Sequence, residues 1–468
     1  MTPSRPPDAT NNLPLPESRN GDPATGTDSI SPETAERDSW AFGLKHWLHQ
    51  HVLTTIATMP IEQLDEHEIR LDLYRAAETI CLDNSWALPL PEQETLAEQV
   101  LNEFLAPIDG LMNDHDISDI VINGPRQLFI EKRGQLQSTD FAFRNENHLL
   151  LVIRRLIAAS GRRLDAKTPM VDARLADGSR MNAVLKPPAL NGPLVSIRRL
   201  GSRPLTVEDL LANESVTKEM VDFLAACVRS RISMIISGGT GSGKTTLMNA
   251  LSRYVPNTER VVTIEEAAEL ELQQSHVAKL EAQQAGEDGT GVAVTVRELI
   301  RNSLRMRPDR IIVGECRGAE ALEMLQAMNT GHEGSLTSIH ANTARDAITR
   351  IELMIGLAGL DLPIWAIRRL IASSVTLIVQ IARLPGGKRK IVTIAEIAGM
   401  EGETVSMHNL FEYLQTGVDE AQVVEGYFRA TGIRPQCLHR LMVRGAKLPV
   451  EMFADRRLQT QRPRESDR

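Results

Sequence analysis

The sequence has no cysteine cluster, no long apolar run and no excess of basic residues. Its four cysteines, Cys81, Cys227, Cys316 and Cys437, are far apart and form no CxxC motif. That spacing argues against a structural zinc site or a disulfide framework, so we expect reduced thiols in a cytosolic protein. No apolar run approaches the roughly 18–20 residues needed to cross a bilayer. The polar N-terminus lacks the apolar core of a secretory signal. These features predict a cytoplasmic chain, without a transmembrane segment, that meets a membrane only through partners.

The charge balance is slightly acidic. Lys and Arg total 52 and Asp and Glu total 61, a formal net charge of −9, and the pI is near 5.8. This balance argues against a protein whose main surface coats nucleic acid, although local basic stripes remain possible. Charged residues make up 24% of the chain and hydrophobic residues 42%, which is typical of soluble globular domains and excludes wholesale disorder, a fibre or a coiled-coil rod.

Composition and hydrophobic period divide the 468 residues into five segments. The first is rich in proline and small polar residues, which cannot repay the entropy of ordering. The second places apolar residues at helical spacing. The fourth alternates short apolar strands with helices, a pattern typical of a mostly parallel sheet covered by helices. We expect a disordered tail (1–38), a helical module (39–107), a mixed α/β domain (108–203), an α/β domain with a C-terminal extension (204–456) and a charged tail (457–468). The strands expected in the fourth segment are 232–237, 261–265, 311–314, 336–340, 375–380 and 391–395.

Residues 238–246 read GGTGSGKTT and match the phosphate-binding pattern GxxxxGK(S/T). Glycine supplies positive φ angles and lets backbone N–H groups approach an anion closely. An apolar strand precedes the loop and a helix follows, so phosphates would sit at the helix N-terminus. Lys244 would reach the β- and γ-phosphates and Thr245 would ligate Mg²⁺. The alternative is a glycine-rich structural turn. The predicted cofactors are ATP and Mg²⁺, and the predicted binding residues are Gly238, Gly239, Thr240, Gly241, Ser242, Gly243, Lys244, Thr245 and Thr246.

Two apolar strands end in carboxylates. Glu315 follows the strand 311–314, and Glu265 and Glu266 end the strand that begins at residue 261. The carboxyl ends of parallel strands face the ligand crevice, so these side chains would point at the nucleotide. We predict Glu315 as the residue that polarises water and joins Thr245 at Mg²⁺. At least one of Glu265 and Glu266 would assist.

Further candidates are one histidine and two arginines. His340 ends a predicted strand at the same edge and could sense or position the γ-phosphate, although a lone histidine is more often structural. Arg180 and Arg198 lie on strand-like segments before the loop, and guanidinium forks match phosphate oxygens. The alternative for both is a solvated charged face. Another set of arginines recurs every four residues and is expected to form a solvated or intersubunit stripe: Arg297, Arg301 and Arg305.

Four motifs, taken in order, resemble the secretion ATPases of type II and type IV systems. They are GGTGSGKTT, TIEEAAEL (263–270), RMRPDRIIVGECRG (305–318) and GHEGSLTSIHAN (331–342). They correspond to the Walker A, Asp-box, Walker B and His-box motifs of that superfamily. PMVDARLADGSRMNAV (169–184), LQAMNTGHEGS (325–335) and ATGIRP (430–435) make the sequence most similar to the CpaF family of Tad (Flp) pilus assembly ATPases.

The resemblance implies a RecA-like ATPase domain preceded by a PAS-like α+β domain, with nucleotide held between them. It also implies a hexameric ring that binds inner-membrane platform proteins at the cytoplasmic face. Within it, Arg180 and Arg198 match the family's phosphate-facing arginines, and His340 belongs to the His box. Two positions depart from the pattern: the Asp box reads Glu265-Glu266, and Cys316 replaces a small aliphatic residue.

The main hypothesis is therefore an ATP-hydrolysing motor for Tad pilus assembly or type II-like secretion. One alternative is a type IV secretion or conjugation ATPase that moves nucleic acid, which the acidic pI and the lack of a basic, aromatic-rich tract disfavour. Another is a scaffold that binds nucleotide without hydrolysis, which the joint presence of Lys244, Thr245, Glu315 and His340 disfavours.

Overall fold

The computed structural model describes residues 32–58, 65–132, 135–199, 205–283, 292–359 and 362–460. These residues divide into two compact units, one within 1–107 and 147–155 and the other within 108–146 and 156–468. Most of the predicted N-terminal tail and residues 461–468 of the predicted charged tail lie outside the described residues. Helix α1 begins at Pro32, inside the first of these tails, and strand β16 (Arg456–Leu458) extends into the second. Among the described residues, no helix is long and apolar enough to cross a membrane.

The first unit contains the predicted helices. They are α1 (Pro32–Thr58), α2 (Glu66–Asp83) and α3 (Leu90–Leu105). Ile69, Leu73 and Ala77 are buried on α2, in agreement with the helical spacing of apolar residues in this segment, and the Asp65 side chain caps the helix. Pro91 lies in the first turn of α3, where its missing N–H costs no helical hydrogen bond.

The second unit begins with a six-stranded antiparallel sheet, in the order β3-β2-β1-β6-β5-β4. Gly178, at φ +86°, turns the chain between β4 and β5, which pair as an antiparallel hairpin. The elements of this part are α4 (Asp109–Asn113), β1 (Ile117–Asn123), β2 (Leu128–Lys132), β3 (Gln135–Ser138), η2 (Ala158–Ser160), β4 (Met170–Arg174), β5 (Arg180–Val184) and β6 (Leu194–Arg198). Helix α5 (Glu146–Ile157) belongs to the first unit for most of its length.

A ten-stranded sheet forms the rest of the unit, in the order β16-β15-β14-β13-β12-β7-β11-β10-β8-β9. Pairing is parallel from β9 to β12 and antiparallel from β12 to β16, so the expectation of a mostly parallel sheet holds for only part of it. All six predicted strands are present. The strands are β7 (Met234–Ser237), β8 (Val261–Glu265), β9 (Val277–Glu281), β10 (Arg310–Cys316), β11 (Leu336–Ile339), β12 (Leu377–Arg383), β13 (Arg389–Glu401), β14 (Thr404–Val418), β15 (Val424–Ala430) and β16.

The change from parallel to antiparallel pairing has a local cause. Only residues 384–388 separate β12 from β13, and Gly386 and Gly387 both have positive φ. A connection this short closes a hairpin and cannot form the crossover that a parallel neighbour needs. Arg383, at the end of β12, and Arg389, at the start of β13, both lie beside the glycine-rich loop.

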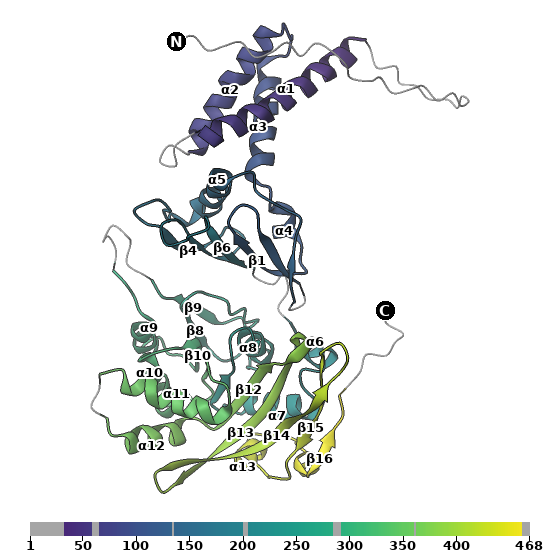
Figure 1. Ribbon diagram of the computed structural model, residues 1–468. Coiled ribbons are helices and arrows are strands. Elements are labelled where there is room, and N and C mark those ends of the chain that lie inside the picture. Colours follow the sequence, from purple (N-terminus) through teal and green to yellow (C-terminus); the bar gives the residue numbers. More distant parts are fainter. Residues whose placement is uncertain are drawn as a thin grey trace. The chain divides into compact units, whose positions relative to one another are not determined.

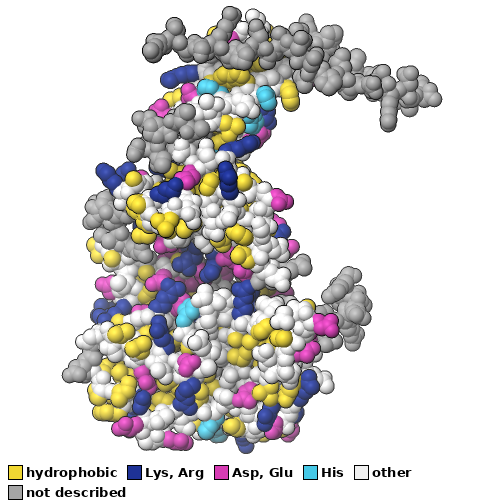
Figure 2. All heavy atoms as spheres, in the orientation of Figure 1, with side chains coloured by type: hydrophobic (Ala, Val, Ile, Leu, Met, Phe, Trp, Pro, Cys, Tyr) yellow, Lys and Arg dark blue, Asp and Glu magenta, His cyan; other side chains and the backbone are white. Residues whose placement is uncertain are grey.

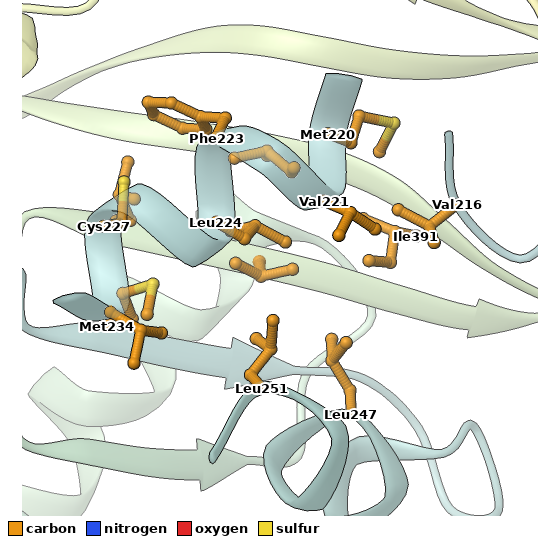
Figure 3. Close-up of a cluster of buried hydrophobic side chains, with 14 of the residues drawn as sticks. Val216, Met220, Val221, Phe223, Leu224, Cys227, Met234, Leu247, Leu251 and Ile391 are labelled. Carbon is orange, nitrogen blue, oxygen red and sulfur yellow. The ribbon is translucent and has the colours of Figure 1, made fainter. Parts of the chain in front are cut away.

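Helices cover both faces of the parallel part of this sheet (Figure 1). Met234 and Ile236 of β7 pack in the core with α7 and α8, whereas Ile235 packs on the other face with α10 and α11, as the period of a strand requires. Figure 3 shows Phe223, Leu224 and Cys227 of α7 in the first of these cores. The helices are α6 (Val207–Ala212), α7 (Lys218–Arg229), α8 (Lys244–Ser252), α9 (Val296–Ser303), α10 (Glu320–Asn329), α11 (Ala344–Gly356), α12 (Ile364–Ser374) and α13 (Leu438–Val443), with short turns η3 (Pro385–Gly387) and η4 (Val450–Phe453).

Candidate nucleotide-binding site

The glycine-rich loop joins the buried strand β7 to α8, as the sequence predicts. Gly241 and Gly243 have φ of +68° and +102°, values that side-chain-bearing residues rarely adopt. A Cβ at Gly238 would stand 2.4 Å from the carbonyl oxygen of Ile381, so only glycine fits there. Lys244 begins α8, and Thr245 and Thr246 follow it, half-buried, in the first turn. The loop therefore presents backbone N–H groups at a helix N-terminus, an arrangement that suits a phosphate.

Lys244 has its amine inside this loop. The side chain is buried, and Nζ donates to the carbonyl oxygens of Gly238 and Gly239, each at 3.1 Å. Desolvation lowers the pKa of Lys244, and the nearby Glu315 carboxylate opposes that shift. A buried ammonium group is unfavourable unless an opposite charge lies beside it. A polyphosphate bound in the glycine-rich loop would supply that negative charge.

His340 stands between the lysine and the Walker B carboxylate. It follows β11 directly, and its Nε2 lies 3.2 Å from Lys244 Nζ and 2.7 Å from Glu315 Oε1. The contact with Glu315 has the distance of an ion pair without the angles of a hydrogen bond. Desolvation and the Lys244 charge lower the pKa of His340, so the neutral ring is favoured. The structure thus brings three predicted residues together from α8, β10 and the end of β11.

The two Asp-box carboxylates occupy different surroundings. Glu265 is buried and accepts hydrogen bonds from the backbone N–H groups of Glu269, at 3.0 Å, and Leu270, at 3.1 Å. A Cβ at Gly314 would stand 2.8 Å from Glu265 Cγ, so this glycine makes room for the carboxylate. Burial raises the pKa of Glu265. Glu266 is exposed and pairs with Arg317 at 2.7 Å. Glu265 therefore organises the turn after β8, and Glu266 is the carboxylate open to solvent.

Arg317 is a site residue that the sequence reasoning did not select. One guanidinium nitrogen lies 2.7 Å from Glu266 and the other 2.9 Å from Glu315, so the side chain bridges the two carboxylates. Its place in the Walker B segment, two residues after Glu315, was the available signal. Cys316, between them, is buried, and burial raises its pKa to about 12, as expected of an inert thiol.

A cleft of about 1420 Å³ within the second unit collects four of the predicted residues. Glu266 and Glu315 line it together with Arg180 and Arg198. Arg180 pairs with Glu269 at 2.7 Å and Arg198 with Asp119 at 3.2 Å. The structure thus brings the two arginines to the carboxylates, and it places them in ion pairs rather than on a plain solvated face.

His340 lines a smaller pocket of about 480 Å³ with Gly239 and Thr240.

In the predicted arginine stripe, Arg297 and Arg301 pair with the buried Glu323 of α10 at 2.7 and 2.6 Å. Arg301 is nevertheless exposed, as expected of a solvated stripe, whereas Arg297 is half-buried against the Glu323 carboxylate.

Among the described residues, no group of three histidine, cysteine or acidic side chains is placed to hold a metal ion by itself. At nucleotide sites, Mg²⁺ generally takes its ligands from phosphate oxygens, water and one or two protein oxygens. The Thr245 hydroxyl and the Glu315 carboxylate are the available oxygen ligands. The residues present fit MgATP.

Comparison with known proteins agrees with this geometry. Residues 102–433 match the model of the family described as Type II/IV secretion system protein. A putative conjugal transfer protein of Mycobacterium tuberculosis is 36% identical over 301 residues, covering 63% of this chain and 85% of the relative. The type IV secretion system protein VirB11 of Bartonella henselae is 31% identical, covering 62% of this chain and 91% of the relative.

Among solved structures, the VirB11 ATPase of the Brucella suis type IV secretion system is 26% identical with a TM-score of 0.34, covering 63% of this chain and 96% of that one. The family match spans well over half of the chain. The chain therefore belongs to the type II/IV secretion system protein family.

Proposed function

We propose that this protein is an ATP-hydrolysing motor of a membrane-bound secretion or pilus machine. One observation carries the proposal: the His340 ring lies 3.2 Å from the buried Lys244 amine of the glycine-rich loop and 2.7 Å from the Glu315 carboxylate. Phosphoryl transfer needs positioned donors and charge more than covalent help, and this arrangement supplies both.

Each group has a role in that reaction. The loop amides and Lys244 hold the β- and γ-phosphates, and Thr245 offers its hydroxyl to the metal. When bound, Mg²⁺ neutralises phosphate charge. Glu315 orients the attacking water. His340, next to both Lys244 and Glu315, is placed to respond to the γ-phosphate.

Arg180 and Arg198 would couple hydrolysis to movement. Both line the cleft that also holds Glu315, on strands of the six-stranded sheet, which we propose to be a PAS-like domain. A guanidinium that pairs with Glu269 or Asp119 can exchange that partner for a phosphate oxygen. Loss of the γ-phosphate would then release the sheet. We propose that this cycle runs in a homohexameric ring that contacts inner-membrane platform proteins from the cytoplasm.

Two machines are candidates for the motor. The segments at 169–184, 325–335 and 430–435 support a Tad (Flp) pilus assembly ATPase of the CpaF type. The names of relatives, which include conjugal transfer proteins and VirB11, favour a type IV secretion or conjugation ATPase. On the face drawn in Figure 2, basic and acidic side chains are interspersed, which supports a protein partner more than a nucleic acid. Hydrolysis that DNA stimulates in a salt-sensitive manner would favour the conjugation machine.

The test is phosphate release from MgATP by the full chain. We expect Lys244→Ala to reduce turnover by about a hundredfold or more, since it removes the buried cation at the phosphates. The control is Lys447→Ala, an exposed lysine outside the site, which should leave turnover unchanged. A wild-type protein that binds MgATP without hydrolysing it would support the scaffold alternative instead.

A further inference from the structure

We propose that Arg389, with Arg383 opposite it in the β12–β13 hairpin, positions the apex of the phosphate-binding loop for a nucleoside triphosphate. The inference rests on the proposed function and adds to it two residues that no motif of the loop contains. They lie on the strands that follow the His box, well beyond the Walker A sequence.

Arg389 touches the loop at two points. Its Nε donates to the carbonyl oxygen of Gly241 at 2.9 Å. Its Cδ lies 3.4 Å from the position that a Cβ on Gly243 would occupy, so the side-chain stem packs along the glycine. The two contacts span the positive-φ part of the loop, where the backbone has the most freedom to change conformation.

The bond to the Gly241 carbonyl also orients an amide. In a trans peptide the C=O and the following N–H point in opposite directions. Holding the Gly241 oxygen toward Arg389 therefore directs the Ser242 N–H to the other side, where it donates a hydrogen bond to the Gly239 carbonyl oxygen at 3.4 Å and closes the turn of the loop. Successive N–H groups on the inside of such a loop are what bind phosphate. Arg389 acts on the ligand through the loop backbone that it holds at Gly241, so it is a positioning residue.

Arg383 adds charge at the same place. Arg383 and Arg389 are direct partners in the β12–β13 register, and Arg383 Nη1 lies 3.7 Å from the Cβ position of Gly241. Like charges directly opposite each other on paired strands are unfavourable. Desolvation and the neighbouring Arg383 charge lower the pKa of Arg389. Glu131 lies 3.7 Å from Arg383 and offsets part of this repulsion. A polyanion in the loop would offset more of it, because both guanidinium groups stand at the loop apex.

Equilibrium binding of MgATP to the full chain tests this. We expect Arg389→Gln to raise the Kd for MgATP by about tenfold, the scale of one charge-assisted hydrogen bond. Arg383→Gln should raise it less, because Arg389 is the residue that bonds the Gly241 carbonyl directly. Arg389→Lys, which keeps a charge and a donor, should recover part of the affinity. Lys388→Gln removes an exposed charge from the same hairpin and should leave the Kd unchanged.

Thermal unfolding without nucleotide separates positioning from a structural role. Since Arg389→Gln removes one of two opposed charges, its melting temperature should fall by no more than about 2 °C. The melting-temperature gain on adding MgATP should shrink. An unchanged Kd in Arg389→Gln, or a loss of affinity that Lys388→Gln equals, would overturn the inference. A wild-type chain that binds no MgATP would instead contradict the proposed function.

Discussion

The Nε2 atom of His340 lies 2.7 Å from the Oε1 atom of Glu315. The same nitrogen lies 3.2 Å from Lys244 Nζ. With a proton on Nε2 the ring can pair with Glu315, and without one it can accept a hydrogen bond from Lys244. The lowered pKa of His340 favours the second state. The ring is therefore placed to link the position of the P-loop lysine to that of the Walker B carboxylate.

Replacing Glu315 with Gln should separate binding from chemistry. The side chain keeps its shape, and it loses the charge that orients water. We expect kcat for ATP hydrolysis to fall by about a hundredfold to a thousandfold, with the Kd for MgATP changed little. Single-turnover phosphate release and equilibrium binding measure the two effects. Equal losses in kcat and in affinity for MgATP would show that Glu315 acts mainly in holding the nucleotide.

His340 should make the protein sensitive to mild acid. Its folded-state pKa lies below the ordinary histidine value of 6.5, so the unfolded chain takes up the proton first as pH falls. The contribution of the neutral His340 ring to folding stability is therefore complete above about pH 6.5. It is lost as pH falls toward the folded-state pKa. We expect His340→Asn to lose less stability than the wild type between pH 7.5 and about pH 5.5 in denaturant titrations. Parallel pH profiles for the two proteins would contradict this role.

The contribution of Glu265 to stability should change with pH in the opposite direction to that of His340. Burial raises its pKa above 4.5, so its protonated form is favoured in the folded state. That contribution is present at low pH and is lost as pH rises through the folded-state pKa. Glu265→Gln should therefore be as stable as the wild type, or more stable by about 1 kcal/mol, at pH 7, and the difference should vanish near pH 4. Urea unfolding at the two pH values measures it. A large loss at pH 7 would show that the charged carboxylate is needed for the hydrogen bonds from Glu269 and Leu270.

A buried ion pair at the start of β10 should matter for stability. Arg310 is fully buried and contacts Glu259, which also pairs with Arg231 at 3.0 Å. Arg310→Met should destabilise the fold by about 3–5 kcal/mol, because it removes one of the cations that compensate a buried carboxylate. The control Arg253→Gln breaks an exposed pair with Glu208 and should cost about 1 kcal/mol or less. Chemical denaturation of both variants makes the comparison, and equal costs would rule out the buried-charge explanation.

The cleft arginines should affect turnover more than folding. We expect Arg180→Gln and Arg198→Gln each to lower kcat/KM for MgATP by about tenfold, through loss of a charge-assisted contact to phosphate. Lys186→Gln, in the turn that follows β5 and outside the cleft lining, is the control. Unchanged kinetics in both arginine variants would show that these residues do not contact phosphate and serve only in their ion pairs with Glu269 and Asp119.

Much of the site could be predicted because it is local. The loop 238–246 needs glycine where φ is positive and a lysine at the helix start, and these demands act on neighbouring residues. The strand ends at Glu265, Glu315 and His340 could also be predicted, since parallel strands present their carboxyl ends at one edge. The antiparallel half of the ten-stranded sheet was harder to foresee, because it depends on a short hairpin rather than on the period of each strand.

The glycine-rich loop and the apolar strands that carry the carboxylates therefore follow from near neighbours in the sequence, as does the lack of an apolar run long enough to cross a membrane. Which side chains meet depends on the tertiary structure. It placed Arg389 on Gly241, 148 residues away, and Lys244 beside His340, 96 residues away. It also buried Glu265 and left Glu266 exposed, although the two are adjacent and chemically identical. Backbone conformation follows from near neighbours, whereas burial and charge pairing depend on which distant strands the sheet brings together.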